Sequence, residues 1–331
     1  MATPHHSRRG SMAYYPRVRA KSVDPKIRSW PEIKGEVKVQ GFAGFKVGMT
    51  HVEMIDYRKK SVTAGQPILV PVTVVEVPPL DVVGYRLYDE DAEGNLVVVF
   101  EAWAKDLDKE IFRKIPEIKK VAERDPPESY EDVRIIVATR NKDVSGIPSK
   151  KPEIFELRIG GGNSVKERLD YAKNHLGKQI TFTDFSKPGK FVDVVSITKG
   201  KGFTGHVKRF GVKLLPRKNR KHRRMIGTLG PWHPDWVRNT VPQAGQMGFQ
   251  QRTISNVRVI KYGSKDEVDS INVRGGFLHY GFVKNDYVLL FGSIPGASKR
   301  LIKMRDPARQ KVPDIEEVKL EYISLESKQG D

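Results

Sequence analysis

The chain contains no cysteine among its 331 residues. Disulfide bonds, zinc sites built on thiolates and cysteine nucleophiles are therefore excluded. Long apolar runs are also missing: none approaches the roughly 18 residues that a membrane-spanning helix needs, and the amino-terminal residues lack the apolar stretch of a signal peptide. We therefore expect an intracellular, soluble protein.

Acidic residues are absent from one long stretch and nearly absent from another. None precedes Asp24, and Asp235 is the only one from Val194 to Lys265, where 16 lysines and arginines give a net charge of +15. The whole chain carries +19, whereas the segment from Glu76 to Asp132 carries −8. Because like charges repel unless a polyanion neutralises them, this asymmetry predicts a nucleic-acid partner in preference to a merely solvated basic surface.

The spacing of apolar residues favours β structure. It predicts strands at 37–42, 68–77, 96–100, 133–138, 179–182, 191–198, 254–262, 269–273 and 287–291. It predicts helices over 109–123, which Pro116 should kink or split, and over 165–176, with Asn163 or Ser164 as cap and Gly177 at the end. Between 200 and 253 the apolar residues follow neither the alternation of a strand nor the spacing of a helix. This segment is longer than an ordinary loop.

These patterns divide the chain into parts of different character. We expect a proline-containing, extended basic arm over 1–35 and an acidic α/β insertion over 101–178. Strands separated by glycine and proline, as in a barrel, occupy 36–100, 179–199 and 254–331. A basic irregular extension of the barrel covers 200–253. The fold class is therefore mainly β.

The segment Gly200–Gly205 matches the pattern G-x-G-x-x-G and follows a predicted strand. A dinucleotide-binding unit needs a helix after the glycines and an acid about 20 residues further on. That region instead reads RKNRKHRR, and the next acid is Asp235. The glycines are better suited to letting the backbone approach phosphates closely.

Six of the eight residues from Arg217 to Arg224 are basic, and Gly230, Trp232 and Trp236 follow them. Cations meet phosphates, and the planes of tryptophan stack on unpaired bases. This mixture favours structured RNA over duplex DNA. A nuclear address or a solvated tail would account for the charges alone.

No catalytic constellation is visible. His206, His222 and His233 have no partner at metal-ligand spacing, and motifs for a nucleotide-binding loop, a serine hydrolase or a zinc protease are absent. We expect no enzymatic activity, no cofactor and no metal. Two alternatives stay open on these residues: an RNA-modifying enzyme with a basic docking arm, and a DNA-compacting chromosomal protein.

Four stretches together resemble the large-subunit ribosomal protein L-three family. They are DVVSITKGKGFTGHVKR at 193–209, GFAGFKVGMT at 41–50, AGQMG with the following Arg-Thr at 244–253, and GSIPG at 292–296. The start, HHSRRGSMAYYPRVRA, is similar to the arm of archaeal and eukaryotic members, as is the acidic insertion.

The resemblance implies a six-stranded translation-type β-barrel and an extension that threads through 23S rRNA toward the peptidyl transferase centre. It implies a cytoplasmic protein of the large ribosomal subunit that binds near the 3′ end of this rRNA and nucleates assembly. The expected neighbours are large-subunit proteins fourteen and e-type twenty-four, with no membrane contact and no homo-oligomer.

The charge map and the resemblance together predict one set of RNA-binding residues. It comprises Arg8, Arg9, Arg17, Arg19, Lys21, Lys199, Gly200, Lys201, Gly202, Lys208, Arg209, Arg217, Lys218, Arg220, Lys221, Arg223, Arg224, Trp232, His233, Trp236, Arg238, Gln246 and Arg252.

Overall fold

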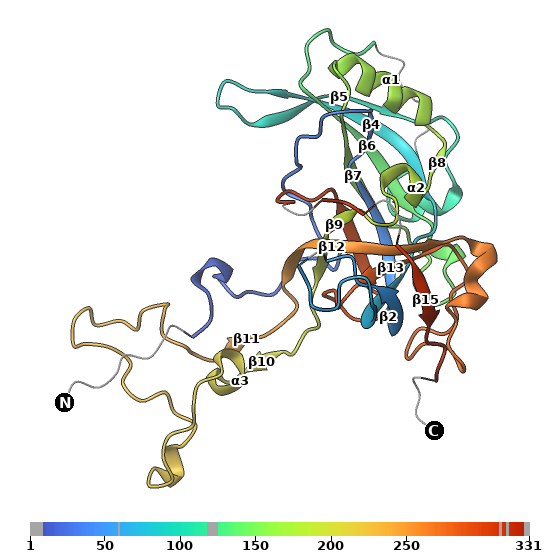
Figure 1. Ribbon diagram of the computed structural model, residues 1–331. Coiled ribbons are helices and arrows are strands. Elements are labelled where there is room, and N and C mark those ends of the chain that lie inside the picture. The colour runs from blue at the N-terminus through green and yellow to red at the C-terminus, as the bar shows by residue number, and fades with distance from the viewer. Residues whose placement is uncertain (1–8, 59, 118–124, 311–312, 316–317, 328–331) are drawn as a thin grey trace. The chain divides into compact units, whose positions relative to one another are not determined.

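A computed structural model describes residues 9–58, 60–117, 125–310, 313–315 and 318–327 (Figure 1). The chain divides into two compact units. We call Asp24–Ser196 with Thr253–Asp331 the body, and Met1–Val23 with Ile197–Arg252 the extension unit. Strands are the predominant regular structure in the described residues, which confirms the mainly β fold class.

The first sheet is antiparallel, and its pairings return to their starting point. Its seven strands follow the order β14 (Leu301–Arg305), β9 (Phe191–Ile197), β12 (Gln251–Gly263), β13 (Tyr287–Phe291), β3 (Pro67–Glu76), β2 (Gly41–Ile55) and β15 (Leu320–Ile323). Because β14 also pairs with β2, six of these strands form a closed ring, and β15 lies outside it on β2. Valines 72, 74 and 75 of β3 are fully buried inside the body, as expected for β-branched residues in a barrel-like core.

The second sheet belongs to the same unit. Its order is β1 (Lys38–Val39), β7 (Ile154–Gly160), β6 (Asp132–Thr139), β4 (Leu80–Glu90) and β5 (Leu96–Trp103), with β8 (Gln179–Ile180) also paired to β4. We expected the barrel to run to residue 100. The structure instead pairs β4 with β5 on one side and β6 on the other, so the second sheet begins at Leu80.

Two helices flank these sheets. Helix α1 (Val165–His175) contacts β6, β4 and β7, and Leu169 and Ala172 are buried there. The Ser164 hydroxyl accepts a hydrogen bond from the Lys166 N–H, which confirms the predicted cap. Helix α2 (Phe182–Phe185) places Phe182 edge-on to Phe42 of β2, with ring centroids 5.7 Å apart.

Four predicted elements differ. The strand expected over 37–42 is divided between β1 and β2, which belong to different sheets, and the strand expected over 179–182 ends at Ile180, because Phe182 begins α2. The strand expected at 269–273 is wrong: a 3-10 helix (Lys265–Ser270) leads into irregular backbone, because the Asp286 carboxylate holds the Lys265 N–H and the Asn272 amide bridges both backbone groups of Val283. The helix expected over 109–123 is a 3-10 helix at Lys109–Arg113 that ends before Pro116. Residues 118–124 lie outside the described residues.

A buried carboxylate joins β3 to the loop before β13. Glu76 is fully buried and forms no ion pair within the described residues. Its oxygens accept from the Asn285 amide at 2.7 Å, from the Asn285 and Lys284 N–H groups, and from the Tyr280 hydroxyl. Burial, together with the neighbouring carboxylate, raises the pKa of Tyr280 and keeps its hydroxyl a donor.

We predict that Glu76→Ala lowers the free energy of unfolding by about 2–4 kcal/mol, because several buried donors lose their acceptor. Urea unfolding of the full chain, followed by tryptophan fluorescence, measures this change. Glu32→Ala removes an exposed carboxylate of the body and should change stability by no more than about 0.5 kcal/mol. Equal stability of the two variants would contradict the role assigned to Glu76.

Candidate nucleic-acid interface

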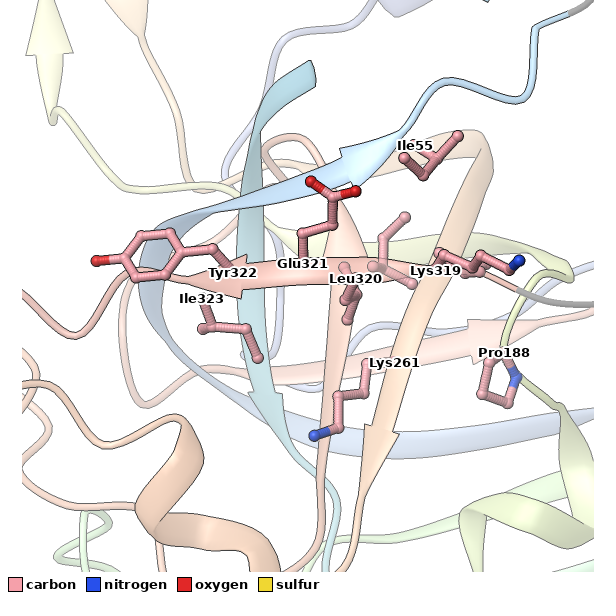
Figure 2. Close-up of a pocket in the computed structure, with 10 residues that line it drawn as sticks. Ile55, Pro188, Lys261, Lys319, Leu320, Glu321, Tyr322 and Ile323 are labelled. Carbon is pink, nitrogen blue, oxygen red and sulfur yellow. The ribbon is translucent and has the colours of Figure 1, made fainter. Parts of the chain in front are cut away.

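The body contains a groove of about 810 Å³ beside β15, shown in Figure 2. Most of its lining is apolar, contributed by Ile55, Pro188, Ile260, Val318, Leu320 and Ile323. Its charged side chains do not converge: Lys261 and Glu321 point in different directions (Figure 2), and Lys261 pairs with Glu267 at 3.0 Å. The groove therefore offers no acid–base pair that would act on a small molecule.

The described part of the chain offers neither a metal site nor a membrane-spanning helix. No group of three or more His, Asp or Glu side chains lies close enough together there to hold a metal ion. No helix among the same residues is long and apolar enough to cross a lipid bilayer.

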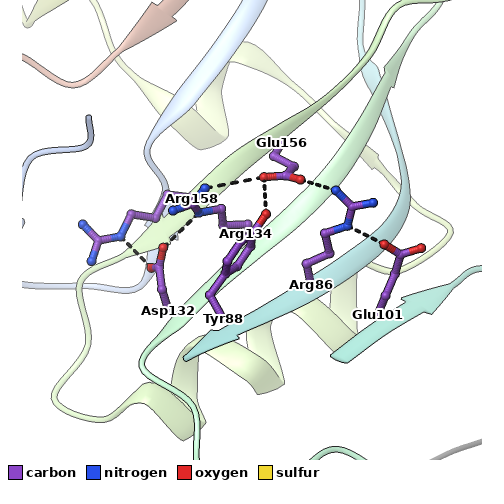
Figure 3. Close-up of polar contacts among 7 residues, drawn as sticks. All are labelled: Arg86, Tyr88, Glu101, Asp132, Arg134, Glu156 and Arg158. Carbon is purple, nitrogen blue, oxygen red and sulfur yellow. Dashed lines mark hydrogen bonds and ion pairs between the residues drawn. The ribbon is translucent and has the colours of Figure 1, made fainter. Parts of the chain in front are cut away.

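Charges in the body neutralise one another. On the second sheet Asp132 accepts from Arg158 at 2.7 Å and from Arg134 at 2.9 Å. Figure 3 shows Arg86 of β4 between the carboxylates of Glu101 and Glu156. Over the whole body 41 basic residues face 39 acidic ones, so its net charge is nearly zero.

The extension unit has the opposite character. It holds 18 lysines and arginines and one acid, Asp235, and so carries nearly all of the chain's net charge of +19. None of these cations forms an ion pair among the residues that the structure describes. The unit therefore presents positive charge that the protein itself does not neutralise.

The base of the extension is a short two-stranded ribbon. β10 (Phe203–Thr204) pairs with β11 (Gly245–Gln246), and the Lys201 N–H donates to the Met247 carbonyl at 2.9 Å. Gly248 has φ +70°, and a side chain there would place its Cβ 2.0 Å from the Lys199 carbonyl oxygen. Gly248 thus serves close backbone pairing, whereas a side chain at Gly202 or Gly205 of the G-x-G-x-x-G segment would meet no atom within 4 Å. The helix after that segment, α3 (His206–Phe210), has only five residues.

Arg209 connects the arm to this ribbon. Its guanidinium donates to the carbonyls of Gln246 at 3.0 Å, Gln243 at 3.0 Å and Arg17 at 3.1 Å. In return the Arg17 guanidinium donates to the Arg209 carbonyl at 2.9 Å and lies 4.2 Å from the centre of the Phe210 ring. Burial, and to a lesser degree Arg17, lowers the pKa of Arg209. Three of its five N–H donors are therefore used within the protein.

Cation–aromatic contacts also join Tyr14 and Arg19 of the arm to the segment that follows β11. The Arg252 guanidinium lies 4.6 Å from the centre of the Tyr14 ring, and that of Arg19 lies 5.2 Å from the centre of the Phe249 ring. The Ala20 N–H donates to the Phe249 carbonyl at 2.8 Å. Two basic segments thus lie side by side although their charges repel, an arrangement that a surrounding polyanion would stabilise.

Most of the predicted RNA-binding residues are exposed. These are Arg19, Lys21, Lys199, Gly200, Lys201, Gly202, Lys208, Arg217, Lys218, Arg220, Lys221, Arg223, Arg224, Trp232, His233, Trp236 and Arg238. Trp232 is 88% exposed and Trp236 69% exposed. Arg9, Arg17, Arg209, Gln246 and Arg252 are partly buried, and Arg8 lies outside the described residues.

Sequence reasoning missed two exposed residues of the same surface. Phe203, on β10, is 83% exposed, and Lys213, after α3, is exposed as well. An aromatic side chain inside a glycine-rich, basic motif was the available signal for Phe203. Its exposure followed only from the ribbon geometry.

Replacing Arg209 tests the connection between arm and ribbon. We predict that Arg209→Ala accelerates hydrogen exchange at the Ala20 amide by roughly tenfold, because three hydrogen bonds that join the segments are lost. Lys208→Ala removes an exposed neighbouring charge and should leave this amide unchanged. Mass-spectrometric exchange on the free protein measures both, and equal rates in the two variants would refute the connection.

Comparison with known proteins identifies the family of this chain. The family model described as Ribosomal protein L3 matches residues 1–330. A protein of Thermoplasma acidophilum, named large ribosomal subunit protein uL3, is 99% identical over 331 residues, with both chains covered completely. Proteins of the same name from Picrophilus torridus and Methanocaldococcus jannaschii are 66% and 45% identical and cover 100% and 98% of this chain. These matches cover 100% and 97% of the two relatives. The chain therefore belongs to the ribosomal protein L3 family, as its four motif stretches predicted.

Proposed function

We propose that this protein is a structural, non-enzymatic constituent of the large ribosomal subunit in the cytoplasm, and that its extension unit binds rRNA. The observation that carries the proposal is the contrast between a body with 41 basic and 39 acidic residues and an extension unit with 18 cations and one acid. Family membership supports it and leaves the modifying-enzyme and chromosomal alternatives without support.

The mechanism is electrostatic and steric. Exposed arginines and lysines from Arg217 to Arg224 neutralise phosphates where RNA segments crowd together, which lets the RNA pack closely against itself. The exposed rings of Trp232 and Trp236 stack on unpaired bases and place the chain, and the glycines at 200 and 202 let backbone approach the phosphates.

The finer proposal concerns where the protein acts. The closed ring of six strands is suited to be the translation-type barrel that the family resemblance implies, with the extension reaching from it through 23S rRNA toward the peptidyl transferase centre. Binding near the 3′ end of this rRNA, early assembly, and contact with large-subunit proteins fourteen and e-type twenty-four complete the proposal. Sucrose-gradient fractionation of a native lysate at moderate and high salt tests it by co-migration with the large subunit.

Salt dependence should report the phosphate contacts. If about eight cations of the extension meet phosphates, the logarithm of the affinity for large-subunit rRNA should fall against the logarithm of salt concentration with a slope of roughly −6 to −7. Filter binding or fluorescence titration between about 50 and 200 mM salt measures it. A slope near −1 would contradict the proposed interface.

Charge neutralisation should change this slope selectively. Replacing Arg217, Arg220 and Arg224 by Gln should make it less steep by about 2 to 3, because three counterion-releasing contacts are lost. The matched control replaces three exposed lysines of the body, Lys34, Lys150 and Lys166, by Gln and should leave the slope unchanged. Equal effects of the two triple variants would mean that net charge alone, and not the extension, sets binding.

A further inference from the structure

β5 is the last strand at one side of the second sheet and pairs only with β4 in the described part of the chain. Four consecutive apolar residues begin it: Leu96, Val97, Val98 and Val99, which are 41–46% exposed. Successive side chains of a strand point to opposite faces, so both faces of this segment are open to solvent. Figure 1 shows the turn of the β4–β5 hairpin extending beyond the rest of the sheet.

The open edge of β5 carries little of the usual protection against pairing: one register irregularity at Val99, and one charged residue, Glu101, which is paired with Arg86 of β4. The backbone of residues 96–100 forms no hydrogen bond outside the β4 ladder within the described residues. No lysine, arginine or proline occurs from Asn95 to Trp103. Soluble proteins commonly use such residues, or very short strands, to block an open edge. The strand at the other side of the sheet, β1, meets this rule with two residues.

Acidic residues surround the exposed end of the hairpin. Asp89, Glu90, Asp91 and Glu93 lie in or beside the turn, and Glu131 is joined to it by its N–H, which donates to the Tyr88 carbonyl at 2.8 Å. None of these carboxylates forms an ion pair among the described residues. Repulsion from Glu90, and after it some loss of hydration and repulsion from Asp89, raises the pKa of Glu131. The cluster therefore lacks an internal counter-charge.

We propose that β5 is a docking edge for an extended, basic segment of another protein in the same particle, which adds a strand to the second sheet. Main-chain hydrogen bonds to β5 supply the pairing, and the apolar side chains of residues 96–99 supply burial. Lysines or arginines of the incoming segment meet the acidic turn.

The charges distinguish this occupant from two others. RNA phosphates would be repelled by the carboxylates around the turn. A second copy of this chain would bring a further acidic turn to the edge, so that like charges would face each other. The proposal rests on the proposed function only in that the partner belongs to the same ribosomal particle.

Photo-cross-linking tests the docking edge. p-Benzoylphenylalanine replaces Val97 or Val98, on opposite faces of β5, in cells that assemble the protein into ribosomes. The control is the same replacement at Val62, which is 100% exposed in a body loop away from β5. We expect cross-links from β5 to a protein peptide with an excess of Lys and Arg, at least fivefold above those from Val62. Cross-links mainly to rRNA, to a second copy or to acidic peptides, or none above Val62, would overturn the proposal.

A charge variant gives a second readout. Val97→Lys with Val99→Lys should reduce retention of the cross-linked basic protein in salt-washed large subunits at least fivefold, because cations now oppose it. Val62→Lys with Leu69→Lys adds the same charge at exposed positions elsewhere in the body and should have no effect. Equal retention in both double variants would refute docking at β5.

Sucrose-gradient fractionation distinguishes failure of the docking proposal from failure of the proposed function. Failure of the unmodified chain to co-migrate with the large subunit would contradict the ribosomal role itself. In that case the cross-links from Val97 and Val98, collected from whichever fraction holds the chain, still decide whether a basic segment occupies β5.

Discussion

The structure depends on positive charge that the protein does not neutralise. Eighteen cations with one acid gather in the extension unit, and two of its basic segments run beside each other in spite of their repulsion. Arginine makes this possible through local contacts: Arg209 binds three backbone carbonyls and Arg17 lies over the Phe210 ring. These contacts position a surface that a bound polyanion would stabilise, as we propose for an rRNA-binding extension.

In the body, basic and acidic residues are nearly equal in number. Arg134 and Arg158 of the second sheet share the Asp132 carboxylate, which lies on the strand of the first and on the strand next to the second. The buried Glu76 carboxylate is satisfied by neutral donors. A nearly neutral body limits non-specific attraction to RNA, which agrees with the proposal that the extension unit is the part that binds rRNA. The acidic turn of the β4–β5 hairpin departs from this internal pairing, and for that reason its charge points to a basic protein neighbour.

Many strands were predictable because alternation of apolar residues and β-branched composition are visible within a short stretch of sequence. Strands β3, β6, β9 and β13 lie within about one or two residues of their predicted ranges. β4 and β14 were missed, because charged residues interrupt their apolar pattern. In β14 the buried Lys303 amine is 2.7 Å from an Asp24 carboxylate oxygen and 3.9 Å from the centre of the Phe155 ring. In β4 Asp81 pairs with Arg140 at 3.3 Å. Partners so far away along the chain leave no local signal.

The sequence by itself determined the class of partner and the family, because net charge, glycine spacing and motif residues are properties of the chain that need no coordinates. Tertiary structure alone decided which cations are exposed and which donate hydrogen bonds to the protein's own carbonyls. Arg209 and Arg217 were both predicted to bind RNA, yet the first is bound to three carbonyls and the second is exposed. It also decided that residues 96–99 form an open edge, since pairing between strands depends on segments far apart in sequence.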